Sequence, residues 1–338
     1  MSHAEPGEAV DIPAVDGRDV RAPSNLAALE GTRRPWAHHG RTFAALGYRF
    51  SFRSTEAGIG RYLDEAYAGC GTGDVTTGSE PPGAGDNGDA VRYSLVDGLP
   101  GLRTHAVYVD DDLGVDADDP AYVLGYLTWH INQQVIGRGS AEHVLVHASG
   151  AVRDGVGVMF PAGQEAGKTT LVAGLVRAGY SYLTDEALAV DTDTLELLPY
   201  AKPLSIDPGS WSVLADLRPD LASPTSAYLA DQWQVPAQHI RPGAVAGPSA
   251  GRVIVFPRYV ADAPTTLESV GRADALASLL GHCFRFHERG ARNFEVLARL
   301  VARSVCFRLS SGDLVEACGA VTRAVDTWSA DPPPGARG

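Results

Sequence analysis

The segment from Phe160 to Leu171 constrains the fold more than any other part of the sequence. It reads F-P-A-G-Q-E-A-G-K-T-T-L, so an apolar strand runs into a loop of small residues, and apolar residues then recur at helical spacing. In such a strand–loop–helix unit, the backbone N–H groups of the loop and the positive end of the helix form a cradle for phosphate oxygens. The segment therefore predicts a nucleotide-binding loop on the edge of a sheet.

The residues expected to bind the nucleotide form one continuous run. They are Ala162, Gly163, Gln164, Glu165, Ala166, Gly167, Lys168, Thr169 and Thr170. Lys168 would reach the β- and γ-phosphates of ATP, and the Thr169 hydroxyl would be a ligand of Mg²⁺. ATP and Mg²⁺ are therefore the cofactors that this segment predicts.

Two residues depart from the usual pattern of a phosphate loop. Ala162 stands where the first glycine of G-x-x-x-x-G-K-[ST] is expected, and Glu165 places a negative charge inside the loop. The alternative interpretation is an ordinary turn between a strand and a helix that contains a lysine. The apolar strand before the loop and the apolar helix after it favour a nucleotide loop.

Two adjacent acids, Asp185 and Glu186, follow the next predicted strand, over residues 180–184. In P-loop proteins an acid at a strand end positions Mg²⁺ and its water, and a second acid nearby can accept the proton of an attacking hydroxyl. Neighbouring side chains of an extended strand point to opposite faces, so both acids can serve one site only if the strand ends in a turn there. The alternative is a solvated turn, but the position one strand after the lysine favours a functional role.

His147 is predicted to close the strand over residues 143–147, before a hairpin that leads to the loop. A single histidine is usually structural or exposed. Beside an acid, it can instead tune the pKa of that acid or contact phosphate. The residues alone leave both interpretations open.

Composition excludes several classes of protein. The chain has 338 residues, of which 44% are hydrophobic and 20% are charged, as in an ordinary globular protein. Its net charge of −13 counts against a general nucleic-acid-binding face, although a local phosphate site remains possible. We find no apolar stretch that would span a membrane and no signal peptide between Met1 and Val15, and the four cysteines are expected to be free thiols, so the expected location is cytoplasmic.

The pattern divides the chain into four parts. Residues 1–40 are expected to form a flexible arm, 41–140 a variable α+β region, 141–328 the domain that carries the P-loop and 329–338 a flexible tail. The α+β region contains strand patterns at 48–53, 91–96 and 105–110, helical patterns near 56–68 and from Pro120 to Gly137, and a disordered loop over 70–90. The later domain contains strand patterns at 143–147, 155–160, 180–184, 187–191, 194–199 and 251–256, and helical patterns at 270–302 and 313–327. Short spacers near 149–154 and 192–193 suit hairpins better than crossovers, which predicts a mixed sheet.

Two further groups of polar residues have two possible interpretations each. Lys202 and Arg258 each follow a strand pattern and lie next to a proline, so either is a candidate for a cationic contact to a transferring phosphoryl group or else a solvated charge. His282 and His287 are not at the spacing that places two metal ligands on one helix face, so they are interpreted as residues of a helix surface.

Together these motifs resemble a known family. The segments H-A-S-G-A-V from His147, G-V-M-F-P-A, A-G-K-T-T-L, G-Y-S-Y-L-T-D-E-A-L-A-V-D and P-Y-A-K-P-L-S-I are similar to the HPr kinase-like branch of the HPr kinase/phosphoenolpyruvate carboxykinase superfamily, in particular to its stand-alone actinobacterial and lasso-peptide-cluster kinases. The similarity covers residues 143–210, and weaker similarity continues at I-V-F-P-R-Y from Ile254 and S-G-D-L-V-E-A from Ser311. The resemblance implies an α/β fold in which a mixed sheet carries the P-loop, with a variable N-terminal α+β region and a helical C-terminal part.

The resemblance also implies roles for individual residues. Asp185, His147 and Lys168 would be catalytic, with Asp185 as the general base and His147 beside it, and Thr169 and Glu186 would hold Mg²⁺. The segment E-I-R-G-[LI]-G of the bifunctional enzymes is absent, and K-P-L-S-I-D stands in its place from Lys202. This difference counts against a phosphorylase activity and against HPr as the substrate.

The sequence thus predicts an ATP- and Mg²⁺-dependent kinase that transfers the γ-phosphoryl group to a hydroxyl, with serine of a protein or peptide as the leading acceptor. One alternative is a kinase of a sugar, amino acid or other metabolite, and another is a nucleotide-binding scaffold without turnover. The expected partners are a nucleotide and a hydroxyl acceptor, with no nucleic acid and no membrane. The sequence leaves the oligomeric state open.

Overall fold

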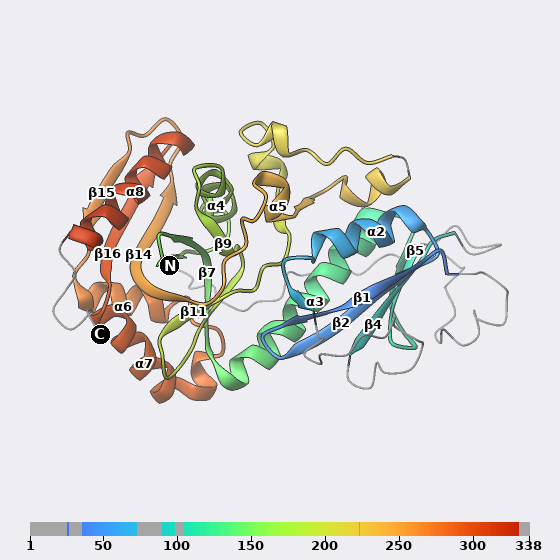
Figure 1. Cartoon of the computed structure of the whole chain (residues 1–338), viewed down its shortest axis with the longest axis horizontal. Coiled ribbons are helices and arrows are strands. Elements are labelled where there is room, and N and C mark those ends of the chain that lie inside the picture. Colours follow the sequence, from blue (N-terminus) through green and yellow to red (C-terminus); the bar gives the residue numbers. More distant parts are fainter. Residues whose placement is uncertain (1–25, 27–35, 73–89, 99–104, 223, 331–338) are drawn as a thin grey trace, which may run out of the picture.

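The structure is a computed structural model, and it describes residues 26, 36–72, 90–98, 105–222 and 224–330. The predicted arm over 1–40, the predicted loop over 70–90 and the predicted tail over 329–338 lie wholly or mostly outside these residues. In the described part, two large sheets follow one another along the chain, and a long helix runs from the first toward the second (Figure 1).

The first sheet has six strands in the order β3-β1-β2-β4-β5-β6. Their bounds are β1 His38–Ala45, β2 Tyr48–Ser54, β3 Gly71–Thr72, β4 Val91–Val96, β5 His105–Val109 and β6 Asp112–Ala117. The pair β2–β4 is parallel and the other pairs are antiparallel. The predicted strands at 48–53, 91–96 and 105–110 are confirmed, whereas β1, β3 and β6 were not predicted.

Two helices pack against this sheet. The helix α2, Ala57–Ala66, buries Ile59, Tyr62 and Leu63 as its apolar spacing predicts, and the Glu56 carboxylate caps it by accepting from the Ile59 N–H. The helix α3, Pro120–Glu142, begins at Pro120 as predicted but does not end at Gly137. It continues because its last turns are packed, with Gly139 against the side chains of Leu46 and Leu145, and this packing outweighs the cost of about 1 kcal/mol for a helical glycine.

The second sheet contains eight strands. Seven lie in the order β11-β10-β7-β8-β14-β16-β15, and β9 pairs with β7 beside β10. Their bounds are β7 Val144–Arg153, β8 Val156–Pro161, β9 Ser181–Thr184, β10 Ala187–Val190, β11 Glu196–Leu198, β14 Ser249–Tyr259, β15 Thr266–Ser269 and β16 Val305–Ser311. β14 is parallel to both β8 and β16, and the other pairs are antiparallel, so the sheet is mixed as predicted.

The hairpin between β7 and β8 is tighter than the sequence pattern indicated. Residues 148–153, which were interpreted as a spacer, belong to β7, and the turn consists of Asp154 and Gly155 with φ values of 52° and 77°. An Asp-Gly pair supports such a turn because both residues tolerate positive φ. His147 therefore lies inside β7 and does not close a strand, which corrects the sequence interpretation.

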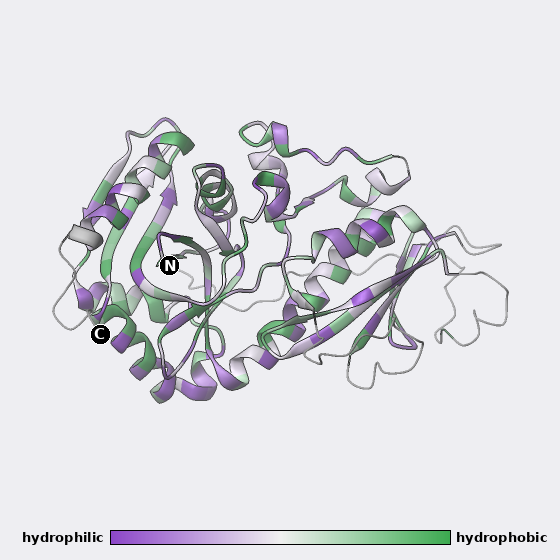
Figure 2. Ribbon diagram, viewed as in Figure 1, coloured by the Kyte–Doolittle hydropathy of each residue, from purple (hydrophilic) through white to green (hydrophobic). Residues whose placement is uncertain are grey.

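Helices cover both faces of the second sheet. On one face, α4 (Lys168–Arg177) and α8 (Leu314–Ala330) pack into a core with Phe160, Val255 and Leu309. On the other face lie α6 (Arg272–Leu280) and α7 (Phe286–Ala302), two helices within the region 270–302 where helical patterns were predicted. The helices α6 and α7 carry both hydrophobic and hydrophilic residues, as expected for helices with one buried face (Figure 2).

An irregular segment over 204–240 lies in the chain between β11 and β14, two strands of the second sheet. It contains β12 Leu204–Ile206, η1 Pro208–Ser210, η2 Ala215–Leu217, η3 Thr225–Leu229, β13 Trp233–Val235 and α5 Ala237–Ile240. β12 and β13 form an antiparallel pair, and the rings of Trp211 and Trp233 stack with centroids 4.9 Å apart. No sequence pattern predicted these elements, because each is too short to show a period.

The two sheets share buried apolar residues. One cluster joins Phe50 and Leu127 of the N-terminal region with Leu145, Ala187 and Tyr200 of the later region. The Tyr200 hydroxyl also donates to Asn132 Oδ1 of α3 over 2.5 Å.

With helices packed on mixed sheets, the structure confirms the predicted α/β class with a mixed sheet. None of the described helices is both long enough and apolar enough to cross a membrane.

Candidate functional site

The loop between β8 and α4 has the backbone form of an anion-binding cradle. Glu165 and Gly167 adopt left-handed conformations, with φ values of 59° and 82°, and Gly167 precedes the first residue of α4. Left-handed residues in a short loop turn successive N–H groups toward a common point, to which the helix N-terminus adds its partial positive charge. The Glu165 side chain is exposed.

Lys168 is the first residue of α4, and its side chain is buried. Its ammonium group donates to the carbonyl oxygens of Ala162 and Gly163 over 3.0 and 2.6 Å, so the side chain lies back along the loop. Burial lowers the pKa of Lys168, while the nearby carboxylates of Glu186 and Asp185 oppose this shift. The ammonium thus lies between the loop and the acid pair.

The register of β7 explains why the loop and the acid pair meet. Ala148 of β7 pairs with Pro161, the last residue before the loop, on one side of the strand. On the other side of β7, β9 pairs with the residues from Gly150 onward, and β10 pairs with the residues up to His147. The bend that joins β9 to β10, at Asp185 and Glu186, therefore lies against Ser149, whose hydroxyl donates to the Asp185 carbonyl oxygen. The strand β9 ends at Thr184 and a bend follows, which is the condition for both acids to face one site.

The Asp185 carboxylate is buried, and both of its oxygens are engaged. Oδ1 accepts from the Tyr182 hydroxyl over 2.9 Å and lies 2.8 Å from the Lys202 ammonium. Oδ2 accepts from the Ser205 N–H over 3.0 Å and from the Thr169 hydroxyl over 3.3 Å. The Thr169 contact joins the first turn of α4 directly to the acid pair.

The Glu186 side chain has a different environment, because 37% of its surface is exposed. Its nearest ionisable partner is His147, whose Nε2 lies 3.9 Å from Oε1 of Glu186. Desolvation raises the pKa of Glu186, the negative charges of Asp185 and Asp207 raise it further, and the ammonium groups of Lys202 and Lys168 oppose the shift.

His147 therefore lies near both acids: its Nε2 is 3.9 Å from Glu186, and the charge of Asp185 opposes the lowering of its pKa. Burial lowers the pKa of His147 to about 3, with further contributions from the positive charge of Lys168 and from His282, so the imidazole is neutral at pH 7. A neutral imidazole can donate or accept one hydrogen bond at each ring nitrogen, according to its tautomer.

His282 joins this site, although the sequence interpretation placed it on a helix surface. It lies between α6 and α7, half-buried, and its carbonyl oxygen accepts from the His147 N–H over 2.7 Å. Burial and the positive charge of Lys168 lower the pKa of His282. The interpretation failed because the predicted helical region is divided at this point. His287 is exposed on α7, as the sequence suggested.

Lys202 and Arg258 have separate positions. Lys202 is 2% exposed and, besides its ion pair with Asp185, donates to the Pro203 carbonyl oxygen and to Ser205 Oγ. Arg258 lies exposed near the carboxyl end of β14.

The sequence contains 28 lysine and arginine residues but only two lysines, Lys168 and Lys202, and both lie at the acid pair. An ammonium group is compact and can be desolvated at one point, which the planar guanidinium of arginine cannot reproduce.

The oxygen donors at this site suit Mg²⁺. The Thr169 hydroxyl and the carboxylates of Asp185 and Glu186 are hard oxygen ligands, and Mg²⁺ in proteins usually takes one or two carboxylates and completes its coordination with water and substrate phosphate. Among the described residues, no group of three or more His, Cys, Asp or Glu side chains could hold a metal alone. The donor set therefore fits a cation that arrives with a phosphate.

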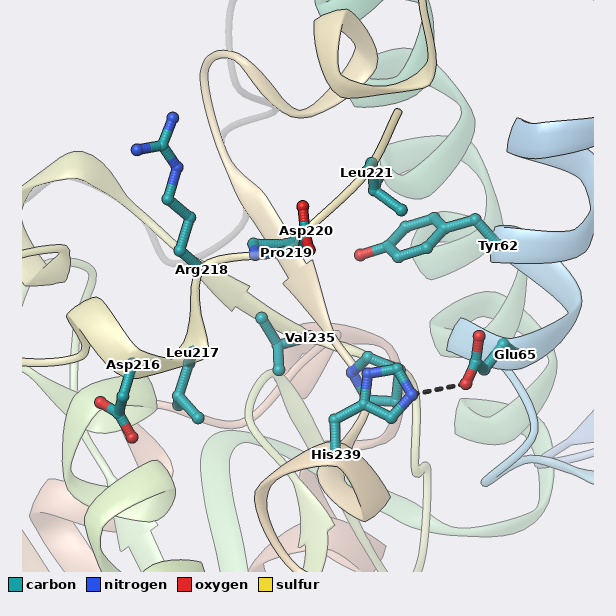
Figure 3. Close-up of a pocket in the computed structure, with 11 residues that line it drawn as sticks. Tyr62, Glu65, Asp216, Leu217, Arg218, Pro219, Asp220, Leu221, Val235 and His239 are labelled. Atoms are coloured by element: carbon teal, nitrogen blue, oxygen red, sulfur yellow. Dashed lines mark hydrogen bonds and ion pairs between the residues drawn. The ribbon is translucent and has the colours of Figure 1, made fainter. Parts of the chain in front are cut away.

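A separate pocket of about 240 Å³ lies between α2 and the 204–240 segment (Figure 3). An ion pair of 2.6 Å between Glu65 and His239 lies at its wall. None of the residues that the sequence predicted for the site lines this pocket. Its lining residues are Tyr62, Glu65, Asp216, Leu217, Arg218, Pro219, Asp220, Leu221, Val235, Pro236 and His239.

Sequence reasoning missed three residues that shape the site. They are Tyr182 and Ser205, which hold Asp185, and His282, which lies beside His147. Their residue types carry no distinctive signal. The rarity of lysine was the one compositional sign that could have assigned Lys202 to the site before the structure was known.

Comparisons with known proteins add one likeness. No family model matches the sequence, and no curated protein matches it. Among solved structures, the Hpr(Ser) kinase/phosphatase from Coxiella burnetii is similar over 55% of this chain and 98% of that chain, with 13% sequence identity and a TM-score of 0.30. A likeness at this level assigns neither a family nor an activity.

Proposed function

We propose that the chain is an ATP- and Mg²⁺-dependent phosphotransferase that transfers the γ-phosphoryl group to a hydroxyl, with serine of a protein or peptide as the acceptor. The observation that supports it best is the contact of Thr169 with Asp185 beside the buried Lys168. This contact brings together a loop suited to phosphate, a hydroxyl suited to Mg²⁺ and a carboxylate. The serine acceptor follows from the sequence resemblance.

In this proposal each element has a defined task. The N–H groups of residues 163–169 bind the β- and γ-phosphates, and the Lys168 ammonium leaves the carbonyl oxygens of Ala162 and Gly163 to pair with them. Thr169, beside the acid pair, would hold Mg²⁺, which when bound would neutralise charge on the β- and γ-phosphates. The acid pair also supplies the proton acceptor for the incoming hydroxyl.

The two lysines allow a sharp test of nucleotide binding. An ATP analogue with an acyl group on its terminal phosphate acylates an amine that lies within reach of that phosphate. We expect this analogue to label Lys168, as read by peptide mass spectrometry, and we expect excess ATP with Mg²⁺ to prevent the labelling. Labelling only at the Met1 amine, or labelling that ATP does not reduce, would contradict the assigned loop.

The transfer itself is tested with γ-labelled ATP, Mg²⁺ and two sets of acceptors, a serine-peptide library and a panel of sugars and amino acids. We expect label on serine peptides and no label with Lys168→Ala. Label on a metabolite alone would replace the peptide acceptor with a small molecule.

A second candidate function is a nucleotide-binding scaffold without turnover, which the carboxylate of Glu165 in the loop favours. This function predicts that ATP protects Lys168 from labelling and that no phosphoryl group is transferred to peptides, to metabolites or to water.

A further inference from the structure

We infer that Glu186, and not Asp185, is the carboxylate that accepts the proton of the attacking hydroxyl. Asp185 is instead a positioning residue that fixes the Thr169 hydroxyl on the metal side of the site. This inference rests on the proposed function and exchanges the roles that the sequence resemblance implied for the two acids.

Asp185 is unsuited to accept a proton from a substrate. A carboxylate offers about four lone-pair positions, and four donors occupy those of Asp185: Tyr182, Lys202, Ser205 and Thr169. Its side chain is 1% exposed, so an acceptor hydroxyl has no path to within hydrogen-bond distance. The ion pair with buried Lys202 further stabilises the charged form, because protonation would leave that ammonium buried and unpaired.

The Thr169 contact gives Asp185 its role. The Thr169 hydroxyl donates its hydrogen to Asp185 Oδ2, which leaves the lone pairs of the hydroxyl oxygen free to face outward from the carboxylate. Such an oriented hydroxyl is the arrangement in which a P-loop threonine binds Mg²⁺ next to a strand-end acid. Asp185 thus sets the direction of a ligand.

Glu186 meets the geometric requirements of a proton acceptor. Its side chain is 37% exposed, and among the described residues no hydrogen bond occupies its carboxylate oxygens. It shares its bend with Asp185, so it lies one residue from the carboxylate that contacts Thr169. The neutral His147 stands 3.9 Å away, close enough to keep the carboxylate on the site side of the bend without occupying it.

The step balances as follows. The acceptor oxygen forms a bond to the γ-phosphorus as the bond from that phosphorus to the β–γ bridging oxygen breaks, and ADP leaves. The proton of the acceptor hydroxyl moves to a carboxylate oxygen of Glu186 and is released to solvent after the product departs.

The test compares Glu186→Gln with Asp185→Asn. ADP formation is followed under single-turnover conditions with water and with serine peptides as acceptors, and the affinity for MgATP is measured by calorimetry. We expect Glu186→Gln to reduce the rate by a factor of about 10²–10⁴, the usual contribution of a positioned base, and to leave the MgATP affinity within about threefold of wild type. Asp185→Asn should weaken MgATP binding by about 10–100-fold, the usual cost of losing a group that orients a metal ligand.

Chemical rescue separates proton transfer from a structural role. The Glu186 side chain is partly exposed, so a small carboxylate can take its place when it is removed. Formate should therefore restore part of the rate of Glu186→Ala but none of the rate of Glu186→Gln, in which the glutamine side chain fills the space. Asp185→Asn leaves the Lys202 ammonium without its ion pair, so the melting temperature of this variant is measured in parallel. If Asp185→Asn is unfolded, the Glu186 variants alone decide the inference.

Two outcomes would overturn the inference, and they are distinct. If the wild type forms ADP while Glu186→Gln keeps its rate, or if formate fails to rescue Glu186→Ala, the base is not Glu186 although the phosphotransferase stands. If the wild type binds MgATP but forms no ADP with water or serine peptides, the proposed function fails and the inference fails with it.

Discussion

Two adjacent threonines at the start of α4 have different partners. Thr169 Oγ1 donates to Asp185, whereas Thr170 Oγ1 shares a hydrogen bond of 2.6 Å with Ser210 Oγ of η1. The pair therefore offers a matched comparison, because both side chains are half-buried and one helix turn carries both.

We expect Thr169→Val to weaken MgATP binding at least about tenfold, because it removes a metal ligand. Thr170→Val should leave this affinity unchanged and lower the free energy of unfolding by about 0.5–1.5 kcal/mol, the usual net value of a hydrogen bond. Calorimetry and urea unfolding of both variants check the prediction. Equal losses of MgATP affinity in the two variants would remove Thr169 from the site.

Glu165 stores strain inside the loop. A non-glycine residue at a φ of 59° costs about 1 kcal/mol or more, and its charge repels phosphate. Glu165→Gly is expected to raise the free energy of unfolding by about 1 kcal/mol and to tighten ATP binding. Asp154→Gly is the control, because it also relieves a positive φ and removes an acid, but it lies at the opposite end of β8. Tighter ATP binding in the control would show that net charge alone causes the effect.

At the scale of elements, α4 is held against α8 through a glycine. A Cβ at Gly174 would lie 2.8 Å from Leu314 Cδ1 and 2.9 Å from Cys318 Sγ, so this position permits the close approach of the two helices. Gly125 of α3, in contrast, is exposed, and a Cβ there would meet nothing within 4 Å.

These two glycines predict opposite effects of the same substitution. Gly174→Ala should lower the free energy of unfolding by about 1–3 kcal/mol through overpacking. Gly125→Ala should raise it by about 0.8–1 kcal/mol because alanine is the better helix former. Urea unfolding of the two variants checks the signs. A stabilising Gly174→Ala would show that α8 shifts away at little cost.

Element boundaries show where local patterns lose their predictive power. The apolar spacing in α2 was sufficient to predict the helix. The strands against which this helix packs, β1 and β2, immediately precede it in the chain, so local sequence and packing agree. In α3, the glycine at 137 suggested an end, yet the contact of the next turn with Leu46 extends the helix. A helix end is decided by the sum of propensity and packing, and the packing term comes from residues far along the chain.

For the whole molecule, the buried neutral His147 makes stability depend on pH. Its pKa of about 3 in the folded state lies below the value of 6.5 expected in the unfolded chain, so between these values only the unfolded state binds the proton. The resulting stabilisation is complete above about pH 6.5 and is lost as the pH falls toward 3.

We expect the wild type to lose about 2 kcal/mol more than His147→Gln between pH 7.5 and pH 5, as measured by urea unfolding at each pH. The exposed His287→Gln serves as the control and should follow the wild type. An identical pH dependence in His147→Gln and wild type would mean that the imidazole is not buried in its neutral form.

The resemblance and the local motifs predicted five site residues that the structure places near one another. The structure brings His147, Lys168, Thr169, Asp185 and Glu186 together, in one place on the second sheet. The separate environments of the two acids were not predictable, because the donors to Asp185 come from β9, α4, β12 and Lys202, and only the packed chain brings these together.

By itself, the sequence determined what depends on neighbours along the chain: the loop with its lysine at a helix start, and the apolar faces of α2 and α3. These features arise from backbone preferences and periodicity within a few residues. The tertiary structure alone decided that Asp185 is buried in an ion pair with Lys202 while Glu186 stays partly exposed beside His147. Burial and charge pairing depend on which distant segments come into contact, and that is set when the strands adopt their register.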